Sequence, residues 1–387
     1  MAVVCRPGAI ADLEKILKDR NCSRVFLVSG QNSLRRSGAI NSLTDLLQSC
    51  NVTHFTDVDQ NPSIEQLESG LAKFRDAKPD IIIAVGGGSA MDIAKLIKIF
   101  SYQSQPPRRY VEGKEKLVAA AMPLVAIPTT AGSGSQATHF AVLYIDKSKF
   151  SVAHPSMLPD EALVDPALLK SVPPAVAASA GLDALNQGIE SYWSIHSTNE
   201  SKAIARNAIE LTWAGLRDIT SDPGEDVYLT MATGAHRAGE AINITKTTAP
   251  HAVSYPITAY FGVPHGQATG LILAAVLRYN ALVADEDCLD SRGPAYVRNT
   301  MHEIAGLLGQ PDANAAADAY NEMMEAIGLS RDFYALGIDS ETDIDTIVEH
   351  GFNPQRVGNN PRRLTATALR KMLIELRNQG SPQQVEN

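Results

Sequence analysis

The chain has 387 residues, of which 44% are hydrophobic and 20% charged, which is typical of a globular protein with a substantial core and not of a disordered one. Its formal net charge of -9 argues against a nucleic-acid partner, because the surface as a whole would repel phosphates. No apolar run has the length of a membrane span and the N-terminus lacks a signal-peptide pattern, so we expect no membrane partner. Cys5, Cys22, Cys50 and Cys288 show no metal-binding or redox spacing, which favours a reducing, cytoplasmic location.

The first part of the chain alternates apolar strands with helices. The pattern predicts strands at 25–29, 52–55, 81–85 and 124–127, and helices at 12–19, 39–49, 64–77 and 90–100. Strands that are apolar throughout are typical of a parallel sheet whose two faces are both covered by helices. We therefore expect an α/β domain over residues 1–170.

The strand signal disappears after residue 170. The spacing of apolar residues there predicts helices at 175–194, 201–217, 228–242, 267–284, 297–308, 312–327 and 365–378. We therefore expect an all-helical domain over residues 171–387. In chains organised in this way, ligands usually bind in the cleft between the domains.

Two loops follow predicted strands and are rich in glycine and hydroxyl residues. The first glycine loop, residues 86–89 (GGGS), leads into a helix whose free N–H groups suit a pyrophosphate. Asp92, in the first turn of that helix, is a further candidate cofactor residue. The second glycine loop, residues 128–138 (PTTAGSGSQAT), contains five hydroxyl residues. A tight turn explains either loop alone, but two such loops after two parallel strands favour nucleotide binding.

The residue after the first predicted strand indicates which cofactor is preferred. An acidic side chain there would accept the ribose 2′-hydroxyl of NAD and repel the 2′-phosphate of NADP. The sequence instead has Gly30, followed by Ser33 and then by Arg35 and Arg36. Space, a hydroxyl donor and two cations favour NADP, with NAD as the alternative.

Four side chains of the predicted helical domain have the chemistry of a divalent-metal site. Asp183 and Gln187 lie four residues apart on one helix face, and His251 and His265 follow with Tyr255 between them. A carboxylate, an amide oxygen and two imidazoles can surround one cation and leave a position open for a substrate oxygen. Each residue alone has an ordinary structural explanation, so the hypothesis depends on their combination with the glycine loops.

The motifs GGGSAMD, PTTAGSGSQAT, LVDP, GLDALNQGIE and VPHG occur in this order, and on them the chain resembles the iron-containing (group III) alcohol dehydrogenases along nearly its whole length. The resemblance implies the fold shared with dehydroquinate synthase, a Rossmann-like dinucleotide-binding domain followed by a helical domain. It implies a divalent metal ion held by Asp183, His251 and His265. Fe²⁺ is the preferred ion, and Zn²⁺ and Mn²⁺ are the alternatives. The cofactor residues that it implies are Gly86, Gly87, Gly88, Ser89, Thr129, Thr130, Ser133 and Lys149.

This sequence departs from the family pattern at two positions. Gln187 stands where the family has a histidine ligand, and Tyr255 stands where it has a second histidine, interpreted as a proton relay. Within the family, the run AINITKTTAPHAVSYPIT and the pattern DAL-x-Q resemble the phosphonoacetaldehyde reductase branch, whose members form 2-hydroxyethylphosphonate. Glutamine at this position is therefore interpreted as a trait of that branch.

These features together predict an enzyme that reduces a small aldehyde to an alcohol. The metal would polarise the aldehyde oxygen, NAD(P)H would deliver a hydride, and Tyr255 or His154 would pass the proton. A phosphonate group would need cations and hydroxyl donors near the metal. The candidates for that role are Lys246, Thr248, Arg356 and Arg362.

Other interpretations stay open from the sequence. One is a reductase of another short aldehyde, such as sulfoacetaldehyde or a hydroxyaldehyde, and a second is a lyase like dehydroquinate synthase, in which NAD cycles without net turnover. A third is a binding protein that has lost its metal, which the substitution at Gln187 keeps open. As partners we expect a small anionic aldehyde and a second copy of the chain in a homodimer.

Overall fold

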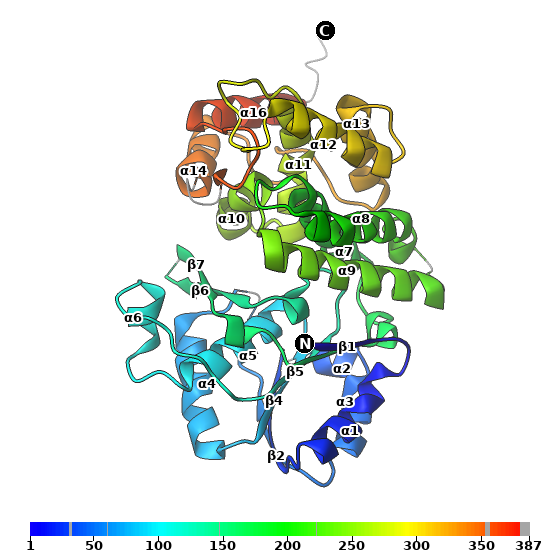
Figure 1. Cartoon of the computed structure of the whole chain (residues 1–387). Coiled ribbons are helices and arrows are strands. Elements are labelled where there is room, and N and C mark those ends of the chain that lie inside the picture. The colour runs from blue at the N-terminus through cyan, green and yellow to red at the C-terminus, as the bar shows by residue number, and fades with distance from the viewer. Residues whose placement is uncertain (31–32, 60, 147, 222, 353–356, 380–387) are drawn as a thin grey trace. The chain divides into compact units, whose positions relative to one another are not determined.

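The computed structural model describes residues 1–30, 33–59, 61–146, 148–221, 223–352 and 357–379. The chain divides into two compact units (Figure 1). The first unit comprises Met1–Pro173 and Asp222–Asn243, and the second comprises Pro174–Ser221 and Ile244–Asn387. Among the residues described, no helix is both long and apolar enough to cross a membrane.

The first unit is built on a six-stranded parallel sheet with the strand order β1-β8-β5-β4-β2-β3. Its strands are β1 (Ala2–Cys5), β2 (Arg24–Ser29), β3 (Asn51–Phe55), β4 (Ile81–Gly86), β5 (Leu124–Pro128) and β8 (Glu161–Val164). The central strands β4 and β5 are buried along their whole length, which explains their uninterrupted apolar sequences.

Helices cover both faces of this sheet (Figure 1). They are α1 (Asp12–Asp19), α2 (Ser33–Arg36), α3 (Ala39–Leu46), α4 (Ile64–Ala77), α5 (Gly88–Phe100) and α6 (Pro107–Val111). Successive strand residues alternate between two cores, because side chains of a strand point to opposite faces. Phe26 packs in the core under α4 and α5, whereas its neighbour Val25 packs in the core under α1 and α3.

An antiparallel hairpin of β6 (Phe140–Ile145) and β7 (Ser148–Ala153) follows the second glycine loop. Helix α9 (Glu225–Thr245) also lies mostly in the first unit, because residues 222–243 group with it. The sequence pattern predicts these residues in the helical domain, over 171–387, and the structure differs from that prediction here. Gly239 gives the physical reason, since a Cβ there would overlap the backbone of Gly134 in the second glycine loop.

The second unit is helical, with no strand in the part that the structure describes. Its helices are α7 (Pro174–Trp193), α8 (Asn199–Gly215), α10 (Ala249–Phe261), α11 (His265–Ala281), α12 (Pro294–Leu307), α13 (Ala313–Ala326), α14 (Glu341–Gly351) and α16 (Ala366–Gln379). Helix α7 packs against both α8 and α11 and is buried almost all round towards its C-terminus. The predicted fold class, an α/β domain followed by a helical domain, is confirmed.

Helix α10 was not predicted from the sequence, and it matters for the site because it carries His251 and Tyr255. Pro250 lies in its first turn, where no backbone N–H is needed, and Pro256 lies inside it. The helix ends at Phe261, and the residue that caps it, Gly262, has a left-handed φ of 70°. His251 and Tyr255 therefore lie one helical turn apart, on the same face of α10.

Candidate active site

Three side chains of the second unit bring ligand atoms together. One ligand atom from each of Asp183, His251 and His265 lies within 4.8 Å of the others. Nε2 of His251 is 3.2 Å from Oδ1 of Asp183, close to the separation of about 3.4 Å for two tetrahedral ligands that each lie about 2.1 Å from one ion. Asp183 and His251 are buried, whereas His265 is partly exposed. Solvent therefore reaches the cluster at His265 and not at the other two residues.

Gln187 is the fourth member of the cluster, one turn after Asp183 on α7. Its Nε2 donates to Oδ2 of Asp183 over 3.1 Å, and its Oε1 is buried with no hydrogen-bond partner among the residues that the structure describes. A buried oxygen without a donor costs about 1–3 kcal/mol, a cost that a bound cation offsets. Both the donor set and this orphaned oxygen therefore fit a divalent ion held by Asp183, Gln187, His251 and His265.

The glycine of the VPHG motif explains how the ligands come so close. Gly266 follows His265 at the start of α11, where a Cβ would overlap the carbonyl oxygen of Ser179 and touch Asp183. Glycine therefore lets α11 begin directly against α7. This contact brings residues 183 and 265 into one cluster although 82 positions separate them in the sequence.

Glu190 lies behind the cluster and was missed by the sequence analysis. Its fully buried carboxylate bonds Nδ1 of His251 and also accepts from both the backbone N and Oγ1 of Thr248. Burial lowers the pKa of His251, but the charges and hydrogen bonds of Glu190 and Asp183 outweigh burial and raise it to about 10. One signal could have revealed Glu190, since residues 183, 187 and 190 recur on one face of a helix.

The two predicted proton donors fall in different units. Tyr255 belongs to the unit of the metal cluster, where its ring stacks on His265 with 6.0 Å between the ring centroids. His154 belongs to the first unit, where its Nδ1 accepts from the backbone N of Ser156 over 3.1 Å. The contact with His265 thus places Tyr255 beside the cluster.

The two glycine loops leave the same edge of the sheet, because β4 and β5 are parallel neighbours. Gly86 is the register partner of Pro128, and the backbone N of Thr129 donates to the carbonyl oxygen of Gly86 over 3.0 Å. A Cβ at Gly88 would lie 2.8 Å from Oγ of Ser133, so the backbone of one loop touches a hydroxyl of the other. The loops form one polar surface at the N-terminus of α5, which suits an anionic group.

The remaining predicted cofactor residues belong to the same unit. Gly87 is the N-cap of α5 and lies 3.4 Å, measured from an added Cβ, from Oγ1 of Thr130. Gly30 directly follows β2 and is partly exposed, as is Lys149 on β7. The others are Ser33 at the start of α2, Ser89 in the first turn of α5, and buried Thr129.

The side chain of Asp92 makes hydrogen bonds within the protein. Its Oδ1 accepts from Oγ of Ser135 over 2.6 Å and its Oδ2 accepts from the backbone N of Val142 over 3.0 Å. Lys95, which the sequence analysis did not single out, donates to the same Ser135 hydroxyl. Burial raises the pKa of Asp92. We conclude that Asp92 supports the second glycine loop from within the fold.

The predicted substrate-binding residues are engaged in different ways. Thr248 is buried and holds Glu190, while Arg362 pairs with Asp287 over 2.6 Å and stacks on Tyr279. Arg356 lies outside the described residues. Lys246 is exposed in the turn between α9 and α10, with a left-handed φ of 60° that is uncommon outside glycine.

Two family models that match this chain belong to the same protein family. A model described as iron-containing alcohol dehydrogenase matches residues 1–166, and the model of the C-terminal part of the Fe-containing alcohol dehydrogenase family matches residues 177–376. The chain is 34% identical to phosphonoacetaldehyde reductase of Streptomyces viridochromogenes, with 92% of this chain and 90% of that protein covered. It is 28% identical to lactaldehyde reductase of Escherichia coli, with 92% and 93% covered. The crystal structure of sulfoacetaldehyde reductase from Bifidobacterium kashiwanohense in complex with NAD+ matches with a TM-score of 0.87 and 29% identity, covering 97% of each chain.

Proposed function

The chain belongs to the iron-containing alcohol dehydrogenase family and is an oxidoreductase that acts on the CH–OH group, and we propose that it works as an NAD(P)H-dependent reductase of a small aldehyde. One observation carries the proposal. Ligand atoms of Asp183, His251 and His265 lie within 4.8 Å of one another, beside the orphaned Oε1 of Gln187. A binding protein that had lost its metal would keep this buried oxygen at a cost that no ion offsets.

The group that these ligands would hold is a divalent metal ion, with Fe²⁺ first and Zn²⁺ or Mn²⁺ as alternatives. Two imidazoles suit Fe²⁺ and Zn²⁺, whereas carboxylate and amide oxygens also suit Mn²⁺. When bound, the ion supplies Lewis-acid chemistry for the carbonyl oxygen of the substrate. The protein contributes the buried side of the cluster, which fixes the ligands and excludes water from behind them.

The cofactor that fits the first unit is NADP, with NAD as the alternative. Gly30 offers no carboxylate after β2 to repel a 2′-phosphate, although the similar sulfoacetaldehyde reductase was crystallised with NAD+. The N-terminus of α5 and the hydroxyls of Thr130 and Ser133 would hold the pyrophosphate. When bound, the reduced nicotinamide supplies the hydride.

The product hydroxyl needs a proton, and Tyr255 is the first candidate to provide it from its Oη. Its ring stacks on that of His265, so this phenol belongs to the side of the cluster that is not closed by buried residues. His154 is the second candidate, although its Nδ1 is occupied by Ser156.

The substrate that we propose is phosphonoacetaldehyde, reduced to 2-hydroxyethylphosphonate. The similarity to phosphonoacetaldehyde reductase supports this choice, and so does the exposed cation Lys246, five residues before His251. The sulfonate analogue sulfoacetaldehyde is the second candidate, since the reductase of that aldehyde has the same fold over 97% of its chain. Its anionic group makes the same demand on Lys246.

A substrate panel tests the proposal. The purified chain, loaded with Fe²⁺, Zn²⁺ or Mn²⁺, is assayed with NADPH and NADH on phosphonoacetaldehyde, sulfoacetaldehyde and lactaldehyde. We expect the highest kcat/KM with phosphonoacetaldehyde and NADPH. A preference for lactaldehyde would overturn the anionic substrate, and no loss of NADPH absorbance with any aldehyde would overturn the reductase.

A further inference from the structure

Glu190 lies in a position where a carboxylate is difficult to bury. It follows Asp183 by seven residues and Gln187 by three on α7, and its side chain is fully buried. An ionised carboxylate in such surroundings is tolerated only when it is paired and its oxygens accept hydrogen bonds. The partners of Glu190 therefore indicate what the residue does.

Both oxygens of this carboxylate are occupied. Oε1 bonds Nδ1 of His251, and Oε2 accepts from the backbone N of Thr248 over 2.7 Å and from its Oγ1 over 2.8 Å. Nε1 of Trp193 donates to the same Oγ1 over 2.8 Å. Because an indole can only donate, the Thr248 hydroxyl accepts from Trp193 and points its own hydrogen at Glu190.

The direction of these hydrogen bonds fixes the imidazole of His251. A carboxylate can only accept, so Nδ1 of His251 carries a hydrogen and Nε2 is the atom that faces Asp183. The backbone N of Thr248, the N-cap of α10, is held by the same carboxylate. Glu190 thus holds both the ring of His251 and the start of the helix that carries it.

We propose that Glu190 is a positioning residue that orients His251 for metal binding through Nε2 and strengthens it as a ligand. This inference rests on the metal centre proposed above. A carboxylate on the far nitrogen of a ligating histidine raises the basicity of the ligating nitrogen and removes the freedom of the ring to turn away. Thr248 and Trp193 act one step further back, by keeping the carboxylate aligned.

Metal affinity is the measurement that tests this role, because it does not depend on turnover. The apparent Kd for Zn²⁺ is measured by chelator competition for the wild-type chain, Glu190→Gln and Glu190→Ala. Glutamine keeps an oxygen for His251 but places an NH₂ group against the donors of Thr248. We expect Kd to rise about tenfold for Glu190→Gln and about a hundredfold for Glu190→Ala.

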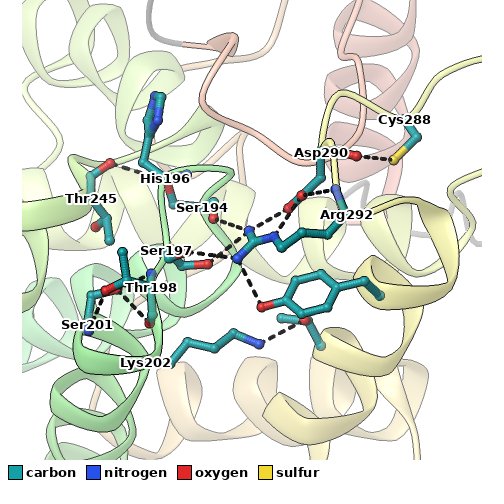
Figure 2. A network of polar contacts seen from close by, with 12 residues as sticks. Ser194, His196, Ser197, Thr198, Ser201, Lys202, Thr245, Cys288, Asp290 and Arg292 are labelled. Atoms are coloured by element: carbon teal, nitrogen blue, oxygen red, sulfur yellow. Dashed lines mark hydrogen bonds and ion pairs between the residues drawn. The ribbon is translucent and has the colours of Figure 1, made fainter.

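A control variant separates this effect from general loss of stability. Figure 2 shows the buried Asp290 in an ion pair with Arg292, whose guanidinium also bonds the carbonyl oxygens of Ser194 and Ser197 just beyond α7. Asp290→Asn weakens this network near the same end of α7 without touching a ligand. Its Zn²⁺ Kd should stay within about twofold of wild type although its unfolding midpoint falls.

The spectrum of bound Co²⁺ gives a second readout, since its visible bands report ligand geometry. The bands should shift in Glu190→Gln and stay unchanged in Asp290→Asn. Wild-type Zn²⁺ affinity in both Glu190 variants would overturn the positioning role and leave the proposed function intact. A wild-type chain that binds neither Zn²⁺ nor Co²⁺ would overturn both proposals. If Glu190→Ala fails to fold, Glu190→Gln decides.

Discussion

Lys95 donates a hydrogen bond to Oγ of Ser135 over 2.7 Å, although its side chain is fully buried. The same ammonium donates to Oγ1 of Thr138 and to the carbonyl oxygen of Phe140, both over 2.8 Å, and lies 3.9 Å from Asp92. One buried charge therefore connects α5, which the first glycine loop begins, to the second glycine loop. We therefore expect the relative placement of the two loops to depend on this lysine.

Replacement of Lys95 by methionine is expected to lower the free energy of unfolding by about 3 kcal/mol, because the oxygens that it satisfies would stay buried without a donor. It should also raise KM for the nicotinamide cofactor more than it lowers kcat, since the loops lose their mutual placement. Urea unfolding and steady-state kinetics at varied cofactor concentration measure the two effects.

Lys98 provides the matched control on the same helix. It is 3% exposed and pairs with Asp160 over 3.0 Å, but the side chain of Asp160 is 38% exposed and regains water when the lysine is removed. Lys98→Met should therefore cost about 1 kcal/mol and leave the cofactor KM unchanged. Equal changes in unfolding free energy and cofactor KM in the two variants would mean that the hydrogen bonds of Lys95 do not position the glycine loops.

The titration of Lys95 predicts a pH dependence of stability. Burial lowers its pKa from 10.5 to about 8, while the nearby charge of Asp92 acts in the opposite direction. Between these values the unfolded chain binds more protons than the folded one, so this lysine makes the folded state more stable as the pH rises from about 8 to 10.5, with a slope of up to about 1.4 kcal/mol per pH unit. The unfolding free energy of wild type minus that of Lys95→Met should rise over this range. If this difference in unfolding free energy did not change with pH, the lowered pKa of Lys95 would be contradicted.

Gln187 allows a prediction about metal choice. In the proposed site its orphaned Oε1 would be a weaker ligand than an imidazole for Fe²⁺ and Zn²⁺. Gln187→His should therefore tighten Zn²⁺ binding about tenfold, or about 1.4 kcal/mol, and reduce relative affinity for Mn²⁺. Competition titrations with both ions check this change. The control is Gln267→Ala on α11, which removes a buried amide bonded to the carbonyl oxygen of Ser330 and should leave both affinities unchanged. Unchanged affinities in Gln187→His would exclude position 187 as a ligand.

Most of the fold follows from local patterns in the sequence. The central strands and most helices are predicted because an apolar strand or an amphipathic helix displays its period directly. Helix α10 is hidden by Pro250 and Pro256, and α14 by its acidic sequence, in which Ile344 and Ile347 supply the buried face. The four-residue strands β1 and β8 were also missed, and nothing in their local sequence explains the difference from the predicted strands.

The site was only partly accessible to sequence reasoning. Ligand chemistry and motif order indicated Asp183, His251 and His265, which the structure brings together. Helical spacing places Glu190 on the same face as Asp183 and Gln187, but its role, like that of Lys95, depends on a partner dozens of residues away. Buried charged residues are predicted from sequence only when their partners are known.

Lys246 should decide between anionic and neutral aldehydes. Loss of one charge-assisted hydrogen bond costs about 1.5–3 kcal/mol, so Lys246→Ala is expected to raise KM for phosphonoacetaldehyde by about tenfold or more. The KM for lactaldehyde should change less than twofold. Lys246→Arg keeps the charge and should retain most of the affinity. Similar changes for both aldehydes in Lys246→Ala would remove the support for an anionic substrate.

Gly266 gives the sharpest structural prediction, because it tests the packing that assembles the ligands. A methyl group there would overlap the carbonyl oxygen of Ser179, so Gly266→Ala must push α11 away from α7 and carry His265 from Asp183. We expect a loss of about 3 kcal/mol in unfolding free energy and at least a tenfold rise in the Zn²⁺ Kd.

The control for this variant is Gly306→Ala on α12, where an added Cβ meets nothing within 4 Å in the described part of the chain. Alanine is the better helix former, so this variant should gain up to about 1 kcal/mol and bind Zn²⁺ as wild type does. If Gly266→Ala also binds Zn²⁺ with wild-type affinity, the close approach of α11 to α7 is not what assembles the ligands. The side-chain rotamers of Asp183, His251 and His265 alone would then bring their ligand atoms together.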